Sequence, residues 1–439
     1  MIALKVAAIH GPLPMTQPLP DDAPALLRRL FDRAVEVADP MQSLAAALPE
    51  KPQGRVVVIG AGKASARMAE AVEAAWGPCE GLVITRYGYA RPCQGIEIVE
   101  AAHPVPDAAG QAATARMLDL VAGLGPEDMV LALISGGASA LLVQPAGDIT
   151  LAEKQAVNAG LLASGAPIGQ MNVLRKHLSR VKGGQLAAAA HPARMVALLI
   201  SDVPGDDPAL IGSGPTVGDA STHEEARAIA ERWALDLPQS VAEVLSRPSG
   251  VVHPDDPRLE TVENVIYAAP SQSLAAASER ARAAGYVPVL LGDALEGEAR
   301  DVARDQAALA LAEQRKLRPG DAPRLLLSGG ELTVTRRGDG VGGPNAEFAL
   351  ALALALEEAE GIHAIACDTD GVDGAAEVAG AVIGPETLGL AQKAGRDPQE
   401  ALDRNDAHGF FAAIDRQVVP GPTLTNVNDF RAIAVFPIG

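Results

Sequence analysis

Residues 55–65 read RVVVIGAGKAS, where a short apolar strand pattern runs into a glycine-rich turn and then into an alanine-rich helical pattern. Glycines let a ligand approach the backbone, and the free N–H groups at the start of the next helix favour an anion such as phosphate. Lys63 adds a full positive charge. The spacing of a Walker motif is absent, and Ser65 stands where a dinucleotide fingerprint has its third glycine. A plain strand-to-helix turn, or an NADP site that uses Arg86, stays open.

The same alternation of strand and helix patterns continues along most of the chain. The runs 129–134 (MVLALI) and 195–200 (MVALLI) are continuously apolar, which is typical of strands buried on both faces. Alanine-rich helical patterns lie between such runs, including one over 172–190, which Gly183-Gly184 would kink or end. Strands that alternate with helices indicate βαβ units. We therefore predict an α/β fold with a Rossmann-like, mainly parallel, three-layer N-terminal domain.

A proline-rich break over 236–262 separates two stretches of this alternation. We predict an N-terminal domain over 1–245 and a smaller α/β C-terminal domain over 260–439, with the active site in the cleft between them. Strand patterns at 325–328 and 331–335, joined by two glycines, predict a hairpin in the second domain. Because a hairpin is antiparallel, we expect the sheet of the C-terminal domain to be mixed.

The composition narrows the class of protein. A net charge of −19 argues against a nucleic-acid surface, which needs a basic face. Three cysteines without a CxxC pair argue against a structural zinc site and a disulfide framework. Neither a long apolar run nor a secretory signal is found, so we expect a cytoplasmic protein without a membrane span. The sequence leaves open whether the chain is a monomer or a homodimer.

Two further turns repeat the sequence Ser-Gly-Gly directly after an apolar strand pattern, at 135–139 and at 328–330. Ligands of open α/β sheets collect at the carboxyl ends of the strands. We predict that both turns hold phosphate oxygens, with an ordinary serine N-cap as the alternative. His103, in the sequence HPVPD, has its direction fixed by prolines, and both a structural and a ligand-binding role stay open.

A basic segment without any acidic residue covers 172–184 (NVLRKHLSRVKGG). On a continuous helix, Arg175, Ser179 and Lys182 share one face, while Lys176 lies on a neighbouring face. Such clustering of like charges in an acidic protein favours a bound anion. A solvated basic face is the alternative.

Two aspartate clusters also follow apolar strand patterns. Asp202, Asp206 and Asp207 lie on a Pro-Gly turn and suit Mg²⁺, which takes one or two carboxylates plus phosphate oxygens. Asp368 and Asp370, in the sequence DTDGVDG, suit a metal site or a base that orients a hydroxyl. In both clusters an aspartate-rich turn is the alternative.

Taken in order, several segments resemble the class II glycerate 2-kinases, a family with a C-terminal MOFRL domain. Some members of that family are labelled hydroxypyruvate reductases. The resemblance runs from about residue 20 to the C-terminus and rests on the segments GAGKAS, HPVPD, SGGASALL, NVLRKHLSRVKGG, ISDVPGDDP, GSGPT, SGGELTVT, GGPNAEFAL and DTDGVDG.

The resemblance implies ATP, a divalent cation, D-glycerate as acceptor and 2-phosphoglycerate as product. It also implies a functional role for Lys63, the lysine of GAGKAS. Many members carry an arginine where this chain has Pro344, so that role is not carried over. Arg336 or Arg337 is a candidate to replace it.

Together these observations predict ATP- and Mg²⁺-dependent phosphorylation of D-glycerate at the C2 hydroxyl. An NAD(P)H-dependent hydroxypyruvate reductase is the alternative enzyme, and a non-catalytic nucleotide sensor is the alternative outside enzymes. The predicted catalytic residues are Lys63, Asp368 and Asp370, and the predicted metal ligands are Asp202, Asp206 and Asp207. The predicted substrate- and phosphate-binding residues are Gly60, Gly62, Ser65, His103, Ser135, Gly136, Gly137, Ser139, Arg175, Lys176, Lys182, Ser328, Gly329, Gly330 and Asn345.

Overall fold

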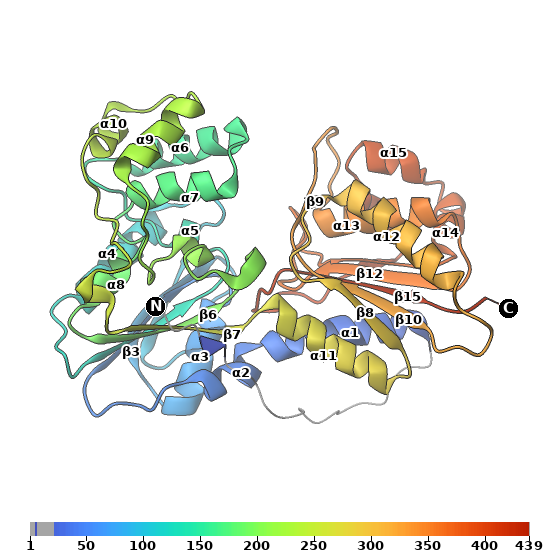
Figure 1. The fold of residues 1–439 in the computed structure, drawn as a ribbon, viewed down its shortest axis with the longest axis horizontal. Helices are drawn as coiled ribbons and strands as arrows, with labels where there is room; N and C mark the ends of the chain where they lie inside the picture. The colour runs from blue at the N-terminus through green and yellow to red at the C-terminus, as the bar shows by residue number, and fades with distance from the viewer. Residues whose placement is uncertain (1–4, 7–21, 439) are drawn as a thin grey trace. The chain divides into compact units, whose positions relative to one another are not determined.

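A computed structural model describes residues 5–6 and 22–438 of the chain (Figure 1). The chain divides into two compact units. Within the described residues, the first unit comprises 5–6, 40–201 and 206–267, and the second comprises 22–39, 202–205 and 268–438. Each unit is therefore built from segments that are not contiguous in the sequence.

The first unit is built on a seven-stranded sheet of order β1-β7-β6-β5-β2-β3-β4. The strands are β1 (Lys5–Val6), β2 (Val56–Ala61), β3 (Glu80–Arg86), β4 (Ile96–Ala101), β5 (Met129–Ile134), β6 (Arg194–Ile200) and β7 (Val262–Ala268). The pairings β1–β7, β6–β5, β5–β2, β2–β3 and β3–β4 are all parallel. Every residue of β5 is buried, as its unbroken apolar run requires. The predicted parallel sheet is confirmed.

The helices of the first unit form two groups. Helices such as α3 and α4 follow strands of the sheet in the sequence and pack near it. In contrast, α6, α7, α9 and α10 pack together around an apolar core of their own (Figure 1). The helices are α2 (Pro40–Ser43), α3 (Ser65–Trp76), α4 (Ala108–Val121), α5 (Ala138–Leu141), α6 (Leu151–Ser164), α7 (Ile168–His177), α8 (Gln185–Ala190), α9 (His223–Arg232) and α10 (Gln239–Leu245). Short 3₁₀ turns cover Leu44–Ala47, Pro204–Asp206, Ile211–Ser213 and Pro257–Leu259.

The helical pattern over 172–190 is interrupted at Gly183-Gly184, as predicted, but its first helix ends earlier than expected. Helix α7 ends at His177, and α8 begins only at Gln185. Gly183 and Gly184 between them have φ angles of 58° and 76°, which a right-handed helix cannot contain. The shared helical face predicted for the basic segment therefore does not exist.

The second unit contains a six-stranded mixed sheet of order β14-β13-β12-β15-β10-β8. Only β8 and β10 pair in parallel, and the other neighbours are antiparallel. The strands are β8 (Val287–Gly292), β10 (Arg324–Ser328), β12 (Ile362–Asp368), β13 (Gly380–Ile383), β14 (Gln417–Val418) and β15 (Asp429–Val435). The predicted mixed sheet is confirmed.

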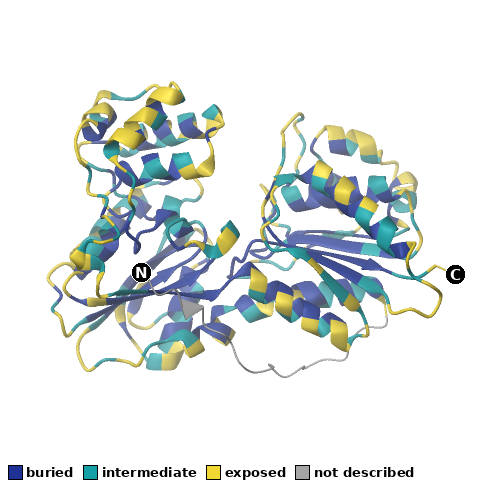
Figure 2. Cartoon of the chain, viewed as in Figure 1, coloured by how far each residue is buried: buried dark blue, intermediate teal, exposed yellow. Residues whose placement is uncertain are grey.

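Helices cover both faces of this second sheet (Figures 1 and 2). One apolar core lies between the sheet and α1 with α11, and another lies between the sheet and α12 with α13. In the first, the rings of Phe31 and Phe430 are 6.2 Å apart. The helices are α1 (Ala23–Ala38), α11 (Pro270–Ala283), α12 (Ala299–Gln314), α13 (Pro344–Leu356), α14 (Thr387–Lys393), α15 (Pro398–Asp403) and α16 (Ala407–Ala413).

The predicted hairpin in this unit is wrong, although the sheet is mixed. After β10, the chain leaves the sheet, and β11 (Leu332–Thr333) pairs in parallel with β9 (Gly297–Glu298). Gly330 allows this change of direction with a φ of 96°, and its backbone lies against Leu295. The antiparallel pairings are instead those of β15 with β10 and β12, of β12 with β13, and of β13 with β14.

Among the described residues, none of the helices has both the length and the apolar character that crossing a bilayer demands.

Candidate active site

The first unit contains a cavity of about 630 Å³. Its walls come from the segment after β4, from the turn and short helix after β5, and from α6, α7 and the segment that follows α7. The cavity brings together five residues that the sequence assigned to substrate or phosphate binding: His103, Gly137, Ser139, Arg175 and Lys182. Residues distant in sequence therefore converge at the carboxyl ends of parallel strands, where ligands of this fold class bind.

Three cations line this cavity, namely Lys154, Arg175 and Lys182, and no carboxylate appears among its described lining residues. Lys154 Nζ donates to the carbonyl oxygen of Leu178 at 3.1 Å. Lys182 Nζ donates to the carbonyl oxygens of Ser139 at 2.7 Å and Leu142 at 3.2 Å. Carbonyl oxygens do not neutralise charge, so the cavity keeps a positive field inside an acidic protein.

Burial makes these cations costly in the absence of an anion. Desolvation, with a smaller contribution from Arg175, lowers the pKa of Lys154 to about 8. Desolvation and the neighbouring cations lower the pKa of Lys182 well below its ordinary value. Perturbed cations that converge in a hollow indicate a functional site for a negatively charged ligand.

Sequence reasoning missed Lys154. It lies in α6 with Val157 and Leu161, and all three residues are buried on the same helical stripe. A lysine within an otherwise apolar stripe was the available signal, because lysine is rarely fully buried without a role.

The lowered pKa of Lys154 predicts that anion binding weakens in mild alkali. Only the protonated amine attracts an anion, so the Kd for sulfate is expected to rise by up to about tenfold between pH 7 and pH 9. Calorimetric titration measures this dependence. In Lys154→Arg the guanidinium stays charged, so the rise should be smaller. Equal pH dependence in both proteins would contradict the assignment of Lys154.

The turn that carries Lys63 is locked to the Ser-Gly-Gly turn after β5. Ser135 Oγ accepts from the backbone N–H of Ala64 at 3.1 Å and lies 3.1 Å from Ser65 Oγ. Both serine side chains are fully buried, so they join the two turns rather than line the cavity. The backbone N–H of Lys63 donates to the carbonyl oxygen of Gly136 at 2.8 Å. The backbone of Lys63 therefore lies next to that of Gly137, which lines the cavity.

Two glycines show how closely the strands β2 and β5 and the turns after them approach their neighbours. Within the strands, a Cβ at Gly60 would lie 2.4 Å from the carbonyl oxygen of Leu133. A Cβ at Gly137, where φ is 82°, would lie 3.0 Å from the His103 ring and 3.3 Å from Lys63 Cγ. His103, Gly137 and Lys63 are thus immediate neighbours.

Gly62→Ala is expected to lower the free energy of unfolding by roughly 2–3 kcal/mol, because the new Cβ would lie 2.0 Å from Ser135 Oγ at a φ of 144°. Urea denaturation followed by circular dichroism measures the loss. Gly77→Ala is the matched control, since Gly77 also has a positive φ of 78° but no atom within 4 Å of its Cβ position. A loss no larger than that of the control would show that the contact between the turns is not tight.

Lys176 does not line the cavity, which corrects its grouping with Arg175 and Lys182. Its Nζ forms an ion pair with Asp219 and its side chain is 4% exposed. The neighbouring His177 contacts Ser249 Oγ through Nδ1 at 2.7 Å and Ser221 Oγ through Nε2 at 3.1 Å. These contacts anchor the end of α7 and leave Arg175 as the cation that α7 gives to the cavity.

Two of the three aspartates predicted to hold metal accept hydrogen bonds from protein groups. Asp207 Oδ1 accepts from the backbone N–H of Ala209 at 2.9 Å, as in an Asx turn. Asp202 Oδ2 accepts a hydrogen bond from Asn426 Nδ2 at 3.1 Å. The backbone of Asp206 is in the left-handed region, with a φ of 54°. In the described part of the chain, no group of three or more His, Cys, Asp or Glu side chains is placed to bind a metal ion. Their role in metal binding remains a prediction.

In the second unit, the Ser328-Gly329-Gly330 turn is held by a buried polar network. Arg431 donates to the carbonyl oxygens of Gly329 at 2.6 Å and Gly330 at 2.8 Å, and to Asp429 at 2.8 Å. Asn345 Nδ2 donates to Asp429 Oδ1 at 2.7 Å. Ser328 Oγ accepts from Gln306 at 3.2 Å. The predicted ligand-binding residues of this turn are thus buried, and the sequence did not single out Arg431.

The DTDGVDG loop of the second unit makes the local contacts of an Asx turn. Asp368 Oδ1 accepts from the backbone N–H of Asp370, and Asp370 Oδ1 accepts from that of Val372. Asp373 accepts from the first N–H groups of α13, at Asn345 and Ala346, and so caps that helix. A role for Asp368 or Asp370 as a base stays a prediction.

Comparisons with known proteins identify the family. One family model, described as a domain of unknown function (DUF4147), matches residues 26–246, and the MOFRL family model matches residues 324–429. D-glycerate 2-kinase of Thermotoga maritima is 35% identical over 413 residues, which cover 93% of this chain and 98% of the relative. The chain belongs to the glycerate kinase family. The predicted resemblance is therefore confirmed, and a kinase family implies the use of ATP.

Two further comparisons bear on the fold and on the activity. The crystal structure of glycerate kinase from Thermotoga maritima matches with a TM-score of 0.85 at 35% identity, over 94% of this chain and 99% of that one. A protein of Agrobacterium vitis, provisionally named hydroxypyruvate reductase, is 52% identical over 416 residues, covering 93% of this chain and 94% of the relative. Relatives of the glycerate kinase family thus carry two different names.

Proposed function

We propose that this protein transfers the γ-phosphate of ATP to the C2 hydroxyl of D-glycerate and forms 2-phosphoglycerate. The observation that carries the proposal is the cavity lined by Lys154, Arg175 and Lys182 without a carboxylate, next to the Lys63 turn. Both glycerate and ATP are anions, and a kinase needs fixed positive charge and donors more than covalent chemistry.

Each cavity residue then has a defined task. Arg175 binds the glycerate carboxylate, because a guanidinium pairs with a carboxylate through two parallel hydrogen bonds. Lys154 and Lys182 supply the charge that holds the anion, and Lys63 stabilises the transferring phosphoryl group. The C2 oxygen forms its bond to the γ-phosphorus as the bond to the ADP oxygen breaks, and the hydroxyl proton passes to a base. Asp368 and Asp370 remain the proposed residues for that base.

Mg²⁺ fits the proposal through its ligand chemistry, because it takes one or two carboxylates and completes its shell with phosphate oxygens and water. Asp202, Asp206 and Asp207 are the proposed carboxylate ligands. When bound, the ion would offset the charge of the ATP phosphates.

The test combines the protein with ATP, Mg²⁺ and D-glycerate and follows the products by phosphorus NMR. We expect ADP together with a phosphate ester on C2. An ester on C3, or ATP hydrolysis without a glycerate ester, would overturn the proposal. A reaction without Mg²⁺ tests the metal separately and should show little turnover.

A hydroxypyruvate reductase is the second candidate, favoured by the name of the relatives that are 52% and 51% identical. The Gly60–Gly62 turn would receive the dinucleotide phosphates, and Arg86 would have to reach the ribose phosphate. Arg86 instead lies over the Tyr89 ring, 4.5 Å from its centroid. Oxidation of NADPH by hydroxypyruvate, followed by absorbance without coupling enzymes, decides between the two functions.

A further inference from the structure

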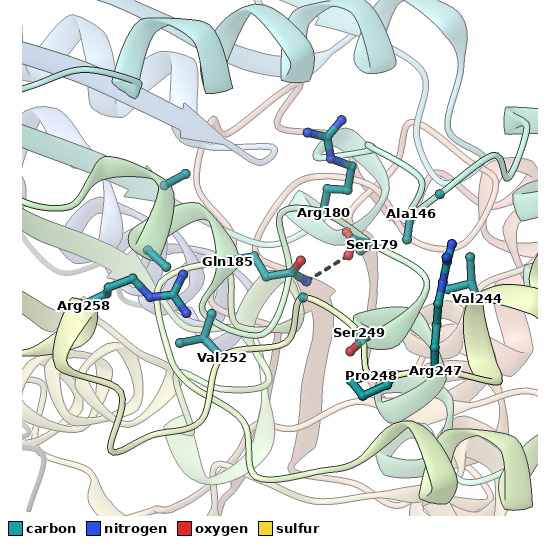
Figure 3. A pocket seen from close by; sticks show the side chains of 14 residues that line it. Ala146, Ser179, Arg180, Gln185, Val244, Arg247, Pro248, Ser249, Val252 and Arg258 are labelled. Atoms are coloured by element: carbon teal, nitrogen blue, oxygen red, sulfur yellow. Dashed lines mark hydrogen bonds between the residues drawn. The ribbon is translucent and has the colours of Figure 1, made fainter.

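The first unit contains a second cavity, of about 420 Å³, which shares no lining residue with the candidate active site (Figure 3). Its walls come from the loop before α6, from the segment between α7 and α8 with α8 itself, and from α10 and the loop after it. The residues used below are Ser179, Arg180, Gln185, Arg247, Ser249 and Arg258.

Three arginines line this cavity, and no acidic residue appears among its described lining residues. Arg258 is already paired, because its Nε and Nη2 donate to Asp256 at 2.9 and 2.8 Å. The guanidinium groups of Arg180 and Arg247 have no hydrogen-bonding or ionic partner within the part of the chain that the structure describes. Both residues are exposed at the mouth of the hollow, and together they give it a local positive charge in a chain with a net charge of −19.

The polar groups between the arginines are held in place. Gln185 Nε2 donates to the carbonyl oxygens of Ser179 and Lys182, each at 2.8 Å. Ser249 Oγ contacts His177 and accepts from the backbone N–H of Val251. In Figure 3, Arg258 and Arg247 lie on opposite sides of the view, with Gln185 and Ser179 between them. A preorganised floor reduces the entropic cost of binding a ligand.

The remaining wall is apolar and suits an organic ligand rather than a bare ion. Ala146, Ala188, Val244 and Val252 contribute side chains to it. The volume exceeds that of a single phosphate ion and is in the lower part of the range for small-molecule sites. An anion with a short carbon skeleton would use both the arginines and this wall.

We propose that this cavity binds a small organic anion with at least two negative charges, carried by phosphate or carboxylate groups, through Arg180 and Arg247. The segment that supplies Ser179, Arg180 and Gln185 to this cavity also supplies Lys182 to the candidate active site. The proposal does not depend on the proposed kinase activity, because none of its residues has a role there.

The test measures the binding of 3-phosphoglycerate and of succinate by calorimetry. The proteins compared are the wild type, the double variant Arg180→Gln with Arg247→Gln, and a control double variant, Arg232→Gln with Arg282→Gln. The control pair removes the same charge from exposed helical positions that line neither cavity. We expect the first double variant to lose one class of site, with at least about tenfold weaker binding, and the control to keep it. A thermal melt verifies that both variants fold.

A co-crystal with the tighter of the two probes places the ligand independently. We expect density between Arg180 and Arg247. Equal binding by all three proteins, or binding of inorganic phosphate alone, would overturn the proposal. Loss of kinase activity in Lys63 variants would not affect this result, so the two proposals fail separately.

Discussion

Replacing Lys63 with alanine is expected to lower kcat for glycerate phosphorylation by about 10³-fold. Charge builds on the equatorial oxygens of the phosphoryl group during transfer, and a positioned ammonium stabilises that charge only in the transition state. The backbone of Lys63 is fixed by its bond to Gly136, and its side chain is only partly buried. The free energy of unfolding should therefore change by less than about 1 kcal/mol.

Steady-state kinetics with ATP and D-glycerate measure this effect. Lys51→Ala is the matched control, because Lys51 is an exposed lysine of the same unit whose Nζ donates to the carbonyl oxygen of Trp76. It should retain full kcat. Turnover of Lys63→Ala near that of the control would remove Lys63 from the mechanism, even if the protein proves to be a glycerate kinase.

The parallel sheet was predictable because its signal is local. A strand segment buried on both faces must be apolar at every position, and β5 and residues 195–200 of β6 show this without any knowledge of their neighbours. A break at Gly183 and Gly184 was also predictable, because glycine is a poor helix former. The end of α7 at His177, several residues earlier, was not predictable from the local sequence and depends on the tertiary fold.

The composition of the candidate site was only partly predictable. Glycines and serines that directly follow a strand pattern can be predicted as ligand-binding residues from their position, and Gly137 and Ser139 do line the cavity. His103, which follows β4, lines it as well. The sequence does not show which groups a charged side chain pairs with, because the partner is often far away along the chain. Lys176, for example, pairs with Asp219, 43 positions away. Lys154 interrupts the apolar stripe of its helix, which was a usable signal, but only the fold shows that its amine lines the cavity.

The same limitation hid the network around Arg431, which lies in β15 together with its ion-pair partner Asp429. Arg431→Met is expected to lower the free energy of unfolding by about 3–5 kcal/mol, because removing one partner leaves the other charge buried. Arg431 is 0% exposed, and its loss would strip Asp429 of an ion pair and Gly329 and Gly330 of their donor. Urea denaturation measures the loss, with Arg194→Met as the control.

Arg194 pairs with Glu263 at the surface, and both side chains are more than a third exposed, so the control should lose less than about 1 kcal/mol. The pH dependence gives a second test. Burial already raises the pKa of Asp429, and Arg431 opposes that rise. Without the arginine, the folded state binds a proton more tightly than the unfolded chain does. Relative to the wild type, Arg431→Met should therefore lose least stability at low pH and more as the pH rises through the raised pKa of Asp429. If, at pH 8, Arg431→Met lowers the free energy of unfolding by no more than Arg194→Met does, the network does not stabilise the turn.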